Sequence, residues 1–163
     1  MAKFLFTMLL CLGLVAAAFG GRHKVPPDEP IVTVQLPDKW KTTERGEHIE
    51  AISPDGTVSF LVMPAEAKKI NEAMGEAMRY LRNKGGITVR SNSMKREDGQ
   101  LNGMDVKNVS WLGKNEKGDV KINFKIMSVP EGKPVIVVYW ASPDTEKKHQ
   151  KELNKILQSI TRI

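Results

Sequence analysis

The chain has 163 residues, of which 40% are hydrophobic and 27% charged, and its formal net charge is +6 at neutral pH. This composition is typical of a folded domain of ordinary size, and it excludes a disordered chain, a collagen and a polytopic membrane protein. The single cysteine excludes a disulfide framework.

Residues 1–20 predict a secretory signal peptide. Lys3 precedes an apolar run at Phe4–Val15, and small residues follow it up to Gly20. The run is much shorter than the about 20 residues that a membrane-spanning helix needs, so we expect cleavage and no transmembrane anchor. Cys11 lies inside the run, where it lacks the small preceding residue of a lipid-attachment site. The sequence therefore predicts an exported protein, periplasmic or secreted, that is soluble after cleavage.

Residues 21–30 carry three prolines and no apolar periodicity, which predicts an extended leader before a domain at residues 31–163. The first part of this domain contains three segments that are typical of strands, at residues 31–36, 47–52 and 57–63. Pro54, Asp55 and Gly56 predict a tight turn, because proline presets φ and glycine accepts a positive φ. The second and third strands are therefore expected to form a hairpin.

Two amphipathic helices are predicted. Over residues 65–84 the apolar side chains recur at spacings of three and four, and Gly85 with Gly86 ends the pattern. Near the C-terminus, Ser142 offers a helix cap and Pro143 suits the first helical position. The apolar stripe of this second helix is Leu153, Ile156, Leu157 and Ile160.

Further strands are expected between the helices, at residues 87–91, 104–112, 120–126 and 135–140, with turn chemistry at residues 97–103 and again within 113–118. Residues 120–126 alternate, with Val, Ile and Phe on one face and Lys121, Asn123 and Lys125 on the other, which predicts one core face and one wet face. The unbroken apolar run at 135–140 predicts a central strand. These elements define one α+β domain.

The order of elements resembles a known fold. Leu36-Pro37 with Trp40, the polar hairpin turn that leads into Phe60, and the Ser142-Pro143 entry to the last helix are similar to the PsbP-like superfamily. Its members have an antiparallel β-sheet sandwiched by helices, and they include photosystem extrinsic proteins, Ran-binding proteins of the Mog group and the periplasmic protein DcrB. The resemblance implies an exported bacterial member that acts by docking onto a larger assembly, without a cofactor.

Four residues are candidates for a binding site. His48 and Glu50 point the same way on a predicted strand and could supply two metal or ligand contacts, but nothing nearby in the sequence completes a set of three or four metal ligands. No metal site is therefore predicted. Trp40, next to a loop, and Trp111, on a strand with Lys107 and Val109, are aromatic residues that could form exposed contacts.

The sequence favours a binding function over an enzymatic one. It has no Gly-x-Ser-x-Gly elbow, no phosphate-binding loop and, after cleavage, no cysteine nucleophile. Its cations are dispersed, which argues against nucleic acid as a partner and leaves weak contact with anionic envelope surfaces. We expect a non-enzymatic accessory protein of the cell envelope that docks to another protein. The alternative is a periplasmic module that binds a small ligand or a metal.

Overall fold

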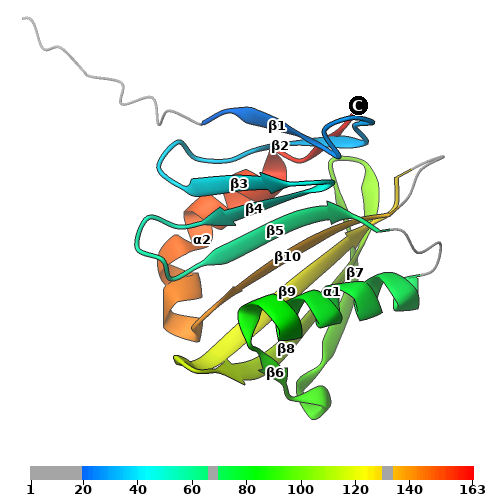
Figure 1. The fold of residues 1–163 in the computed structure, drawn as a ribbon. Coiled ribbons are helices and arrows are strands. Elements are labelled where there is room, and N and C mark those ends of the chain that lie inside the picture. The colour runs from blue at the N-terminus through cyan, green and yellow to red at the C-terminus, as the bar shows by residue number, and fades with distance from the viewer. Residues whose placement is uncertain (1–19, 66–69, 130–133) are drawn as a thin grey trace, which may run out of the picture.

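The computed structural model describes residues 20–65, 70–129 and 134–163 (Figure 1). The predicted signal peptide lies outside the described residues, apart from Gly20. The main sheet contains β3 (Lys41–Arg45), β4 (His48–Ile52), β5 (Ser59–Pro64), β6 (Thr88–Val89), β7 (Lys95–Leu101), β8 (Met104–Asn115), β9 (Gly118–Met127) and β10 (Val135–Ala141). Its strand order is β3-β4-β5-β10-β9-β8-β6, with β7 pairing with β8 as well, and every pair is antiparallel.

A second, smaller sheet joins the two ends of the described chain. It consists of β1 (Arg22–Val25), β2 (Val32–Gln35) and β11 (Thr161–Arg162), in the order β1-β2-β11. The segment at residues 21–30, which was expected to be an extended leader, therefore joins the fold. The strand joins the fold because Val25 is fully buried in the core and so gains apolar contact. The prolines that follow it in the sequence do not indicate this burial.

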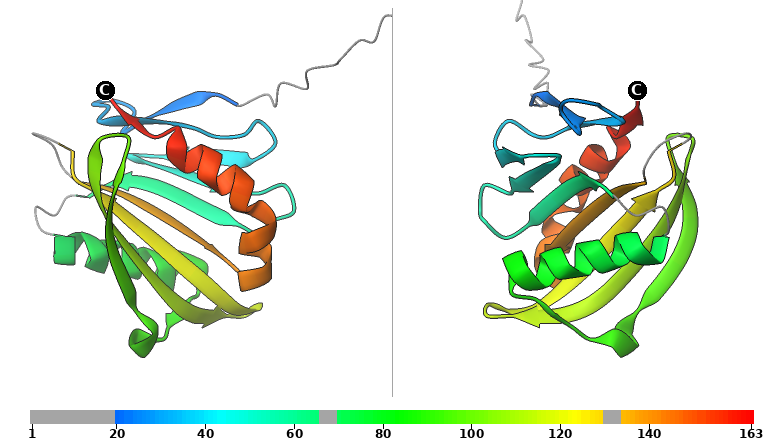
Figure 2. Two further views of the ribbon diagram at one scale, coloured as in Figure 1. Left: turned by 180° about the vertical axis from the view of Figure 1, so that it is seen from behind. Right: turned by 45° about the vertical axis from the view of Figure 1, so that its right-hand side comes forward.

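The two helices cover opposite faces of the main sheet, as the two views of Figure 2 show, one from behind and one turned by 45°. α1 (Ile70–Gly85) buries Ala73, Ala77 and Leu81, and Gly86 follows it with a φ of 59°. α2 (Pro143–Gln158) begins at its predicted cap, where the backbone N–H of Thr145 donates to the Ser142 hydroxyl at 3.3 Å. The predicted fold class is confirmed: one α+β domain with an antiparallel sheet between helices.

The alternation of side chains along the strands divides the interior into two cores. On β9, Val120, Ile122 and Phe124 belong to the core beneath α1, as the sequence pattern predicts. β10 lies between β5 and β9, and its Val137 and Val138 are fully buried in opposite cores. The predicted central strand is thus confirmed.

The structure corrects the prediction for residues 97–103. Most of this segment belongs to β7, and the turn is confined to Asn102 and Gly103, whose φ angles are 50° and 77°. Apart from half-buried Leu101, every residue of β7 is exposed, so the strand has none of the hydrophobic alternation by which strands are recognised. β3, another strand that the sequence analysis did not predict, is also polar. The strand expected at residues 87–91 shortens to β6 and is followed by a 3-10 turn at Ser91–Ser93.

Candidate functional site

The two tryptophans proposed as exposed contacts are buried, so this prediction was wrong for both. Trp40 is 4% exposed and packs in the core beneath α2, with its ring centre 6.4 Å from that of His149. Trp111 is 5% exposed and lies in the core beneath α1, edge-on to Phe124. Burial reflects the strand face: Trp111 alternates with Leu112, and Leu112 is the exposed member of the pair. The two tryptophan rings lie in different cores and do not share a site.

His48 and Glu50 do come together, at the β3–β4 end of the sheet. The Nε2 of His48 lies 3.5 Å from Glu50 Oε1, and the Nε of Arg45 lies 3.5 Å from Glu50 Oε2. From α1, the Tyr80 hydroxyl donates to Glu50 Oε1 at 2.5 Å. We call Arg45, His48, Glu50 and Tyr80 the Glu50 cluster. It borders a hollow of about 200 Å³ beside Trp140.

The Glu50 cluster is organised around one carboxylate. Burial raises the pKa of the Tyr80 hydroxyl, and the hydrogen bond to Glu50 with its negative charge raises it further, so the phenol stays protonated and donates. His48 and Glu50 are the only pair of metal-ligating types in this cluster. Across the described ranges, no group of three or more His, Cys, Asp or Glu side chains is placed to hold a metal ion. The arrangement places the half-buried His48–Glu50 pair beside the hollow, which Arg45, Glu50 and Tyr80 line, and the Tyr80 hydroxyl is engaged by Glu50.

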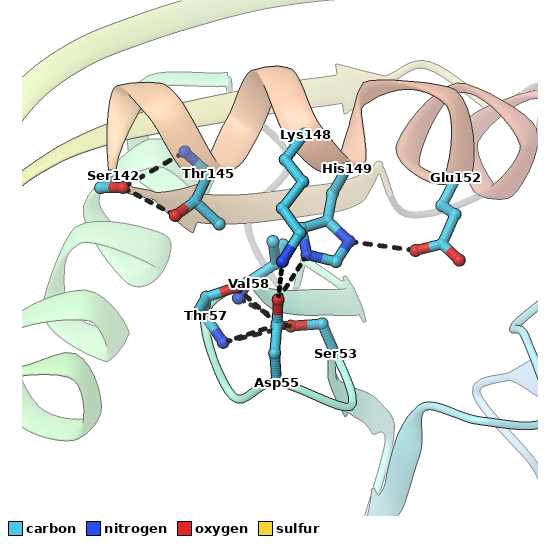
Figure 3. A network of polar contacts seen from close by, with 9 residues as sticks. All are labelled: Ser53, Asp55, Thr57, Val58, Ser142, Thr145, Lys148, His149 and Glu152. Carbon is cyan, nitrogen blue, oxygen red and sulfur yellow. Dashed lines mark hydrogen bonds and ion pairs between the residues drawn. The ribbon is translucent and has the colours of Figure 1, made fainter.

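A second polar network forms at the β4–β5 turn, shown in Figure 3. Asp55 Oδ1 accepts hydrogen bonds from the hydroxyls of Ser53 at 2.7 Å and Thr57 at 2.6 Å. Its other oxygen, Oδ2, lies 2.9 Å from both Lys148 Nζ and His149 Nε2 on α2. These bonds hold the pKa of Asp55 far below its usual value, with Thr57 and Ser53 contributing most.

His149 links this turn to the middle of α2. Its Nδ1 lies 3.1 Å from Glu152 Oε2, so both ring nitrogens face carboxylate oxygens. Burial opposes the charged ring, but the hydrogen bonds and charges of Glu152 and Asp55 outweigh it, and the pKa of His149 is raised. We call Asp55, Lys148, His149 and Glu152 the Asp55 clasp. Because both nitrogens face carboxylates, one on the turn and one on the helix, the clasp fastens the β4–β5 turn to α2.

A third polar region lies on the main sheet itself, on the face that α2 packs against. Residues directly opposite one another on neighbouring strands share a face, so one row across this face reads Glu97, Asn108, Lys125, Val137, Val62 and Ile49. The next row reads Lys95, Ser110, Asn123, Tyr139, Phe60 and Ala51. Both rows are polar from β7 to β9 and largely apolar from β10 to β4. This face of the sheet therefore changes from polar to apolar between β9 and β10.

The polar half of this face is hollow. One hollow of about 550 Å³ and an adjoining one of about 200 Å³ share Asn108 and Lys125 in their lining. We call the two together the sheet groove. β7 borders it on one side, and on the other α2 contributes Asn154, Leu157 and Gln158. In the view from behind in Figure 2, β7 and α2 flank the strands β8 and β9.

Contacts with α2 close the sheet groove at two places. The turn of the β7–β8 hairpin reaches the C-terminal end of α2, where Asn102 Nδ2 donates to the carbonyls of Gln158 at 2.9 Å and Ile160 at 2.6 Å. Towards the N-terminal end of α2, Lys121 Nζ and Asn123 Nδ2 both donate to Glu146, at 3.0 and 3.2 Å from its Oε1. The groove is thus held in shape at both ends of the helix.

Neither the Asp55 clasp nor the sheet groove was predicted as a site from the sequence. For the clasp, the available signals were Ser53-x-Asp55-x-Thr57, in which three oxygens crowd one turn, and His149 three residues before Glu152 on a helix. For the groove, the alternating polar residues of 121–125 were predicted to form a wet strand face. That α2 leaves this face hollow depends on the placement of the helix, which no local pattern specifies.

Comparison with known proteins identifies the fold. No protein-family model and no curated protein matches the sequence. Among solved structures, the cyanobacterial PsbP of Synechocystis sp. PCC 6803 is 10% identical, with a TM-score of 0.57, and the match covers 94% of this chain and 97% of that protein. LpqN of Mycobacterium tuberculosis, which is involved in cell envelope biogenesis, is 12% identical, with a TM-score of 0.52 over 87% and 90% of the two chains.

A third similar structure comes from Bacteroides thetaiotaomicron, with 13% identity and a TM-score of 0.52. The match covers 81% of this chain but 45% of that protein, so the chain spans less than half of its length. The chain therefore has a PsbP-like fold, as the sequence resemblance predicted. At these identities the likeness shows the fold alone. Within the described residues, no helix is long and apolar enough to cross a membrane.

Proposed function

We propose that the protein is an exported, non-enzymatic accessory protein of the cell envelope that binds another protein through the sheet groove. The observation that carries this proposal is the polar half of the sheet face. Asn108, Asn123 and Lys125 lie at interior strand positions, yet they line a hollow of about 550 Å³ beside α2 instead of joining an apolar core. A polar, concave surface on a rigid sheet is suited to orient a partner through hydrogen bonds.

The similar structure of LpqN supports the envelope part of the proposal, since that protein is involved in cell envelope biogenesis. The predicted signal peptide at residues 1–20 supports export. The contacts of His149 are in keeping with a structural role, because the ring joins a carboxylate of the β4–β5 turn to a carboxylate of α2.

Site-specific cross-linking in the producing cells tests the proposal. A photo-reactive amino acid at Ser110, in the sheet groove, is expected to capture one envelope protein, identified by mass spectrometry. The matched control places the same amino acid at Glu72, which is exposed on α1, on the other side of the sheet. Equal capture at both positions, or no capture at Ser110 under any growth condition, would contradict docking through the groove. Sequencing of the mature N-terminus tests export separately.

The Glu50 cluster favours a second candidate function, a module that binds a small polar ligand or a metal ion. His48 and Glu50 are half-buried, Glu50 lines a hollow, and the two were the pair predicted from the sequence. Thermal denaturation with divalent metals and envelope metabolites tests this candidate, because a ligand of the folded state raises the apparent stability. The increase must disappear in His48→Ala, whereas His23→Ala, which changes a histidine paired with Glu44, must retain it.

A further inference from the structure

Lys125 extends from the middle of β9 into the floor of the sheet groove, opposite Asn108 on β8 and Val137 on β10. Its Nζ donates to Asn108 Oδ1 at 2.7 Å. An ammonium group has three donors, and within the described part of the chain this is the one hydrogen bond of the Lys125 amine and no carboxylate lies within 4.0 Å of it. The amine therefore carries its charge against a neutral amide.

A partly buried ammonium group without a nearby carboxylate is energetically unfavourable. Removing an ammonium from water costs free energy unless an opposite charge and further hydrogen bonds replace the solvent. Burial lowers the pKa of Lys125, and the charge of Glu97, two strands away, only partly opposes this effect. By contrast, Lys121 on the same strand has a carboxylate partner, since its Nζ lies 2.9 Å from Glu146 Oε2. The two lysines of one strand face differ in that, among the described residues, Lys125 has no carboxylate within 4.0 Å.

The surroundings of Lys125 suit an anionic group that belongs to a larger, hydrogen-bonding ligand. By the strand register, the charged lining residues that share a face with Lys125 are Lys95 and Lys121 against Glu97, and Lys121 is paired with Glu146. The Ser110 hydroxyl and the amides of Asn108 and Asn123 lie in the same hollow, and an amide side chain offers both donors and an acceptor, as a peptide backbone does. The large apolar residues of this lining, Val109 and Phe124, are buried beneath α1, so the hollow offers no platform for a lipid chain.

We propose that Lys125 anchors an acidic side chain of the partner's docking segment: an Asp or Glu carboxylate accepts hydrogen bonds from the Lys125 amine, while Asn108 and Asn123 bind the adjoining peptide groups. This inference rests on the proposed function, since it names the chemistry by which the sheet groove recognises its partner. Charge-assisted hydrogen bonds of this kind are shorter and about twice as strong as neutral ones.

The direct test uses the unmodified protein and three probes. Lysine side-chain and asparagine amide resonances are followed by NMR during titration with acetyl-Gly-Glu-Gly-amide, with acetyl-Gly-Gln-Gly-amide and with inorganic phosphate. The Glu peptide is expected to bind in the millimolar range, to shift the signals of Asn108 and Asn123, and to raise the titration midpoint of Lys125. The Gln peptide should produce none of these changes.

The outcomes that overturn the inference are distinct. Equal responses to the Glu and Gln peptides would exclude recognition of the carboxylate. A response to phosphate with none to the Glu peptide would assign the site to a different anion. Absence of any change at Lys125 would remove the anion site. In Lys125→Gln, affinity for the Glu peptide should fall about tenfold, the loss expected for one charged hydrogen bond, while Lys41→Gln, at the far edge of the sheet, should leave it unchanged.

Cross-linking separates failure of this inference from failure of the proposed function. If capture from Ser110 occurs and is undiminished in Lys125→Gln, docking through the groove stands and the carboxylate anchor is wrong. If capture from Ser110 never occurs, the docking proposal itself fails. The inference holds only when capture occurs and Lys125→Gln weakens it, with Lys41→Gln capturing as well as the unmodified protein does.

Discussion

His149 shows how a single side chain can fasten two elements and make their attachment sensitive to pH. Its ring lies between Asp55, on the β4–β5 turn, and Glu152, on α2, and it also contacts Trp40 edge-on. Trp40 Nε1 is the one buried side-chain polar atom of the described residues without a hydrogen-bond partner. The ring of His149 thus brings a charged contact to the border of an otherwise apolar core.

The pH dependence of this contact has a definite sign. Because the folded-state pKa of His149 is raised, its contribution to stability is complete below the unfolded value of about 6.5 and is lost as the pH rises through the folded value. The pKa of Asp55 is lowered, so its contribution is present above about 3.8 and declines below it. The Asp55 clasp should therefore stabilise the fold most between about pH 4 and 6.5.

Urea denaturation of the wild type and of His149→Gln between pH 4.5 and 9 measures this effect. We expect the difference in unfolding free energy between the two proteins to be largest at the acidic end and to shrink as the pH rises. A matched control is His23→Gln, since His23 pairs with Glu44 near the surface. A difference that grew with pH would show that His149 is held neutral.

At the scale of single elements, two glycines illustrate opposite constraints. Gly75 lies inside α1, and a Cβ placed there would meet nothing within 4 Å. Gly113 lies in β8, where a Cβ would come within 2.9 Å of the Thr88 carbonyl oxygen on β6 and 3.0 Å of Ile122 Cδ1. The helix glycine is thus replaceable, whereas the strand glycine allows β6 to approach.

We therefore expect Gly75→Ala to raise the unfolding free energy by about 0.5–1 kcal/mol, because alanine is the better helix former. Gly113→Ala should lower it by about 1–3 kcal/mol, because the backbone of β6 must move. Chemical denaturation of both variants measures these changes. Faster hydrogen exchange at Thr88 and Val89 in Gly113→Ala alone would assign its effect to β6, and stabilisation by Gly113→Ala would contradict the packing described.

The strands that could be predicted from the sequence are those whose residues alternate between apolar and polar or are apolar throughout. Strands without such a pattern were not predicted. β9 and β10 were predicted because burial on one or both faces requires apolar residues at those positions. The sequence predicts a turn in place of β7 because its exposed charged side chains show no apolar face. Its pairing with β8 is made by the backbone and by exposed polar pairs, Lys107 with Asp98 and Gln100 with Asp105. The proximity of His48 and Glu50 could be predicted from the sequence because both lie on one strand. The contacts of Tyr80 and Arg45 with Glu50 could not, because these residues belong to other elements.

At the scale of the whole molecule, Asn102 couples the β7–β8 hairpin to α2. Its positive φ makes the turn, and its amide reaches two carbonyls at the end of the helix. Asn102→Gly keeps the backbone conformation but removes both hydrogen bonds, so we expect a loss of about 1–2 kcal/mol of unfolding free energy, measured by chemical denaturation.

Hydrogen exchange of the Ser159 and Ile160 amides, which close the last turn of α2, should become faster in Asn102→Gly. The matched control is Gln100→Gly, which removes a surface amide of the same hairpin that bonds Asp105 and should leave exchange at α2 unchanged. Unaltered stability and exchange in Asn102→Gly would show that the hairpin and the helix hold their positions independently.

The small sheet has a consequence for the order of folding. β2 is completed by β11, and the hydroxyls of Thr33 and Thr161, 128 residues apart, meet at 3.0 Å. The hairpins of the main sheet close over short loops and can form early. The pairing of β2 with β11 requires a loop closure that spans most of the chain, so it is expected to form later. During synthesis β2 therefore remains without its last neighbour until the final residues of the domain emerge.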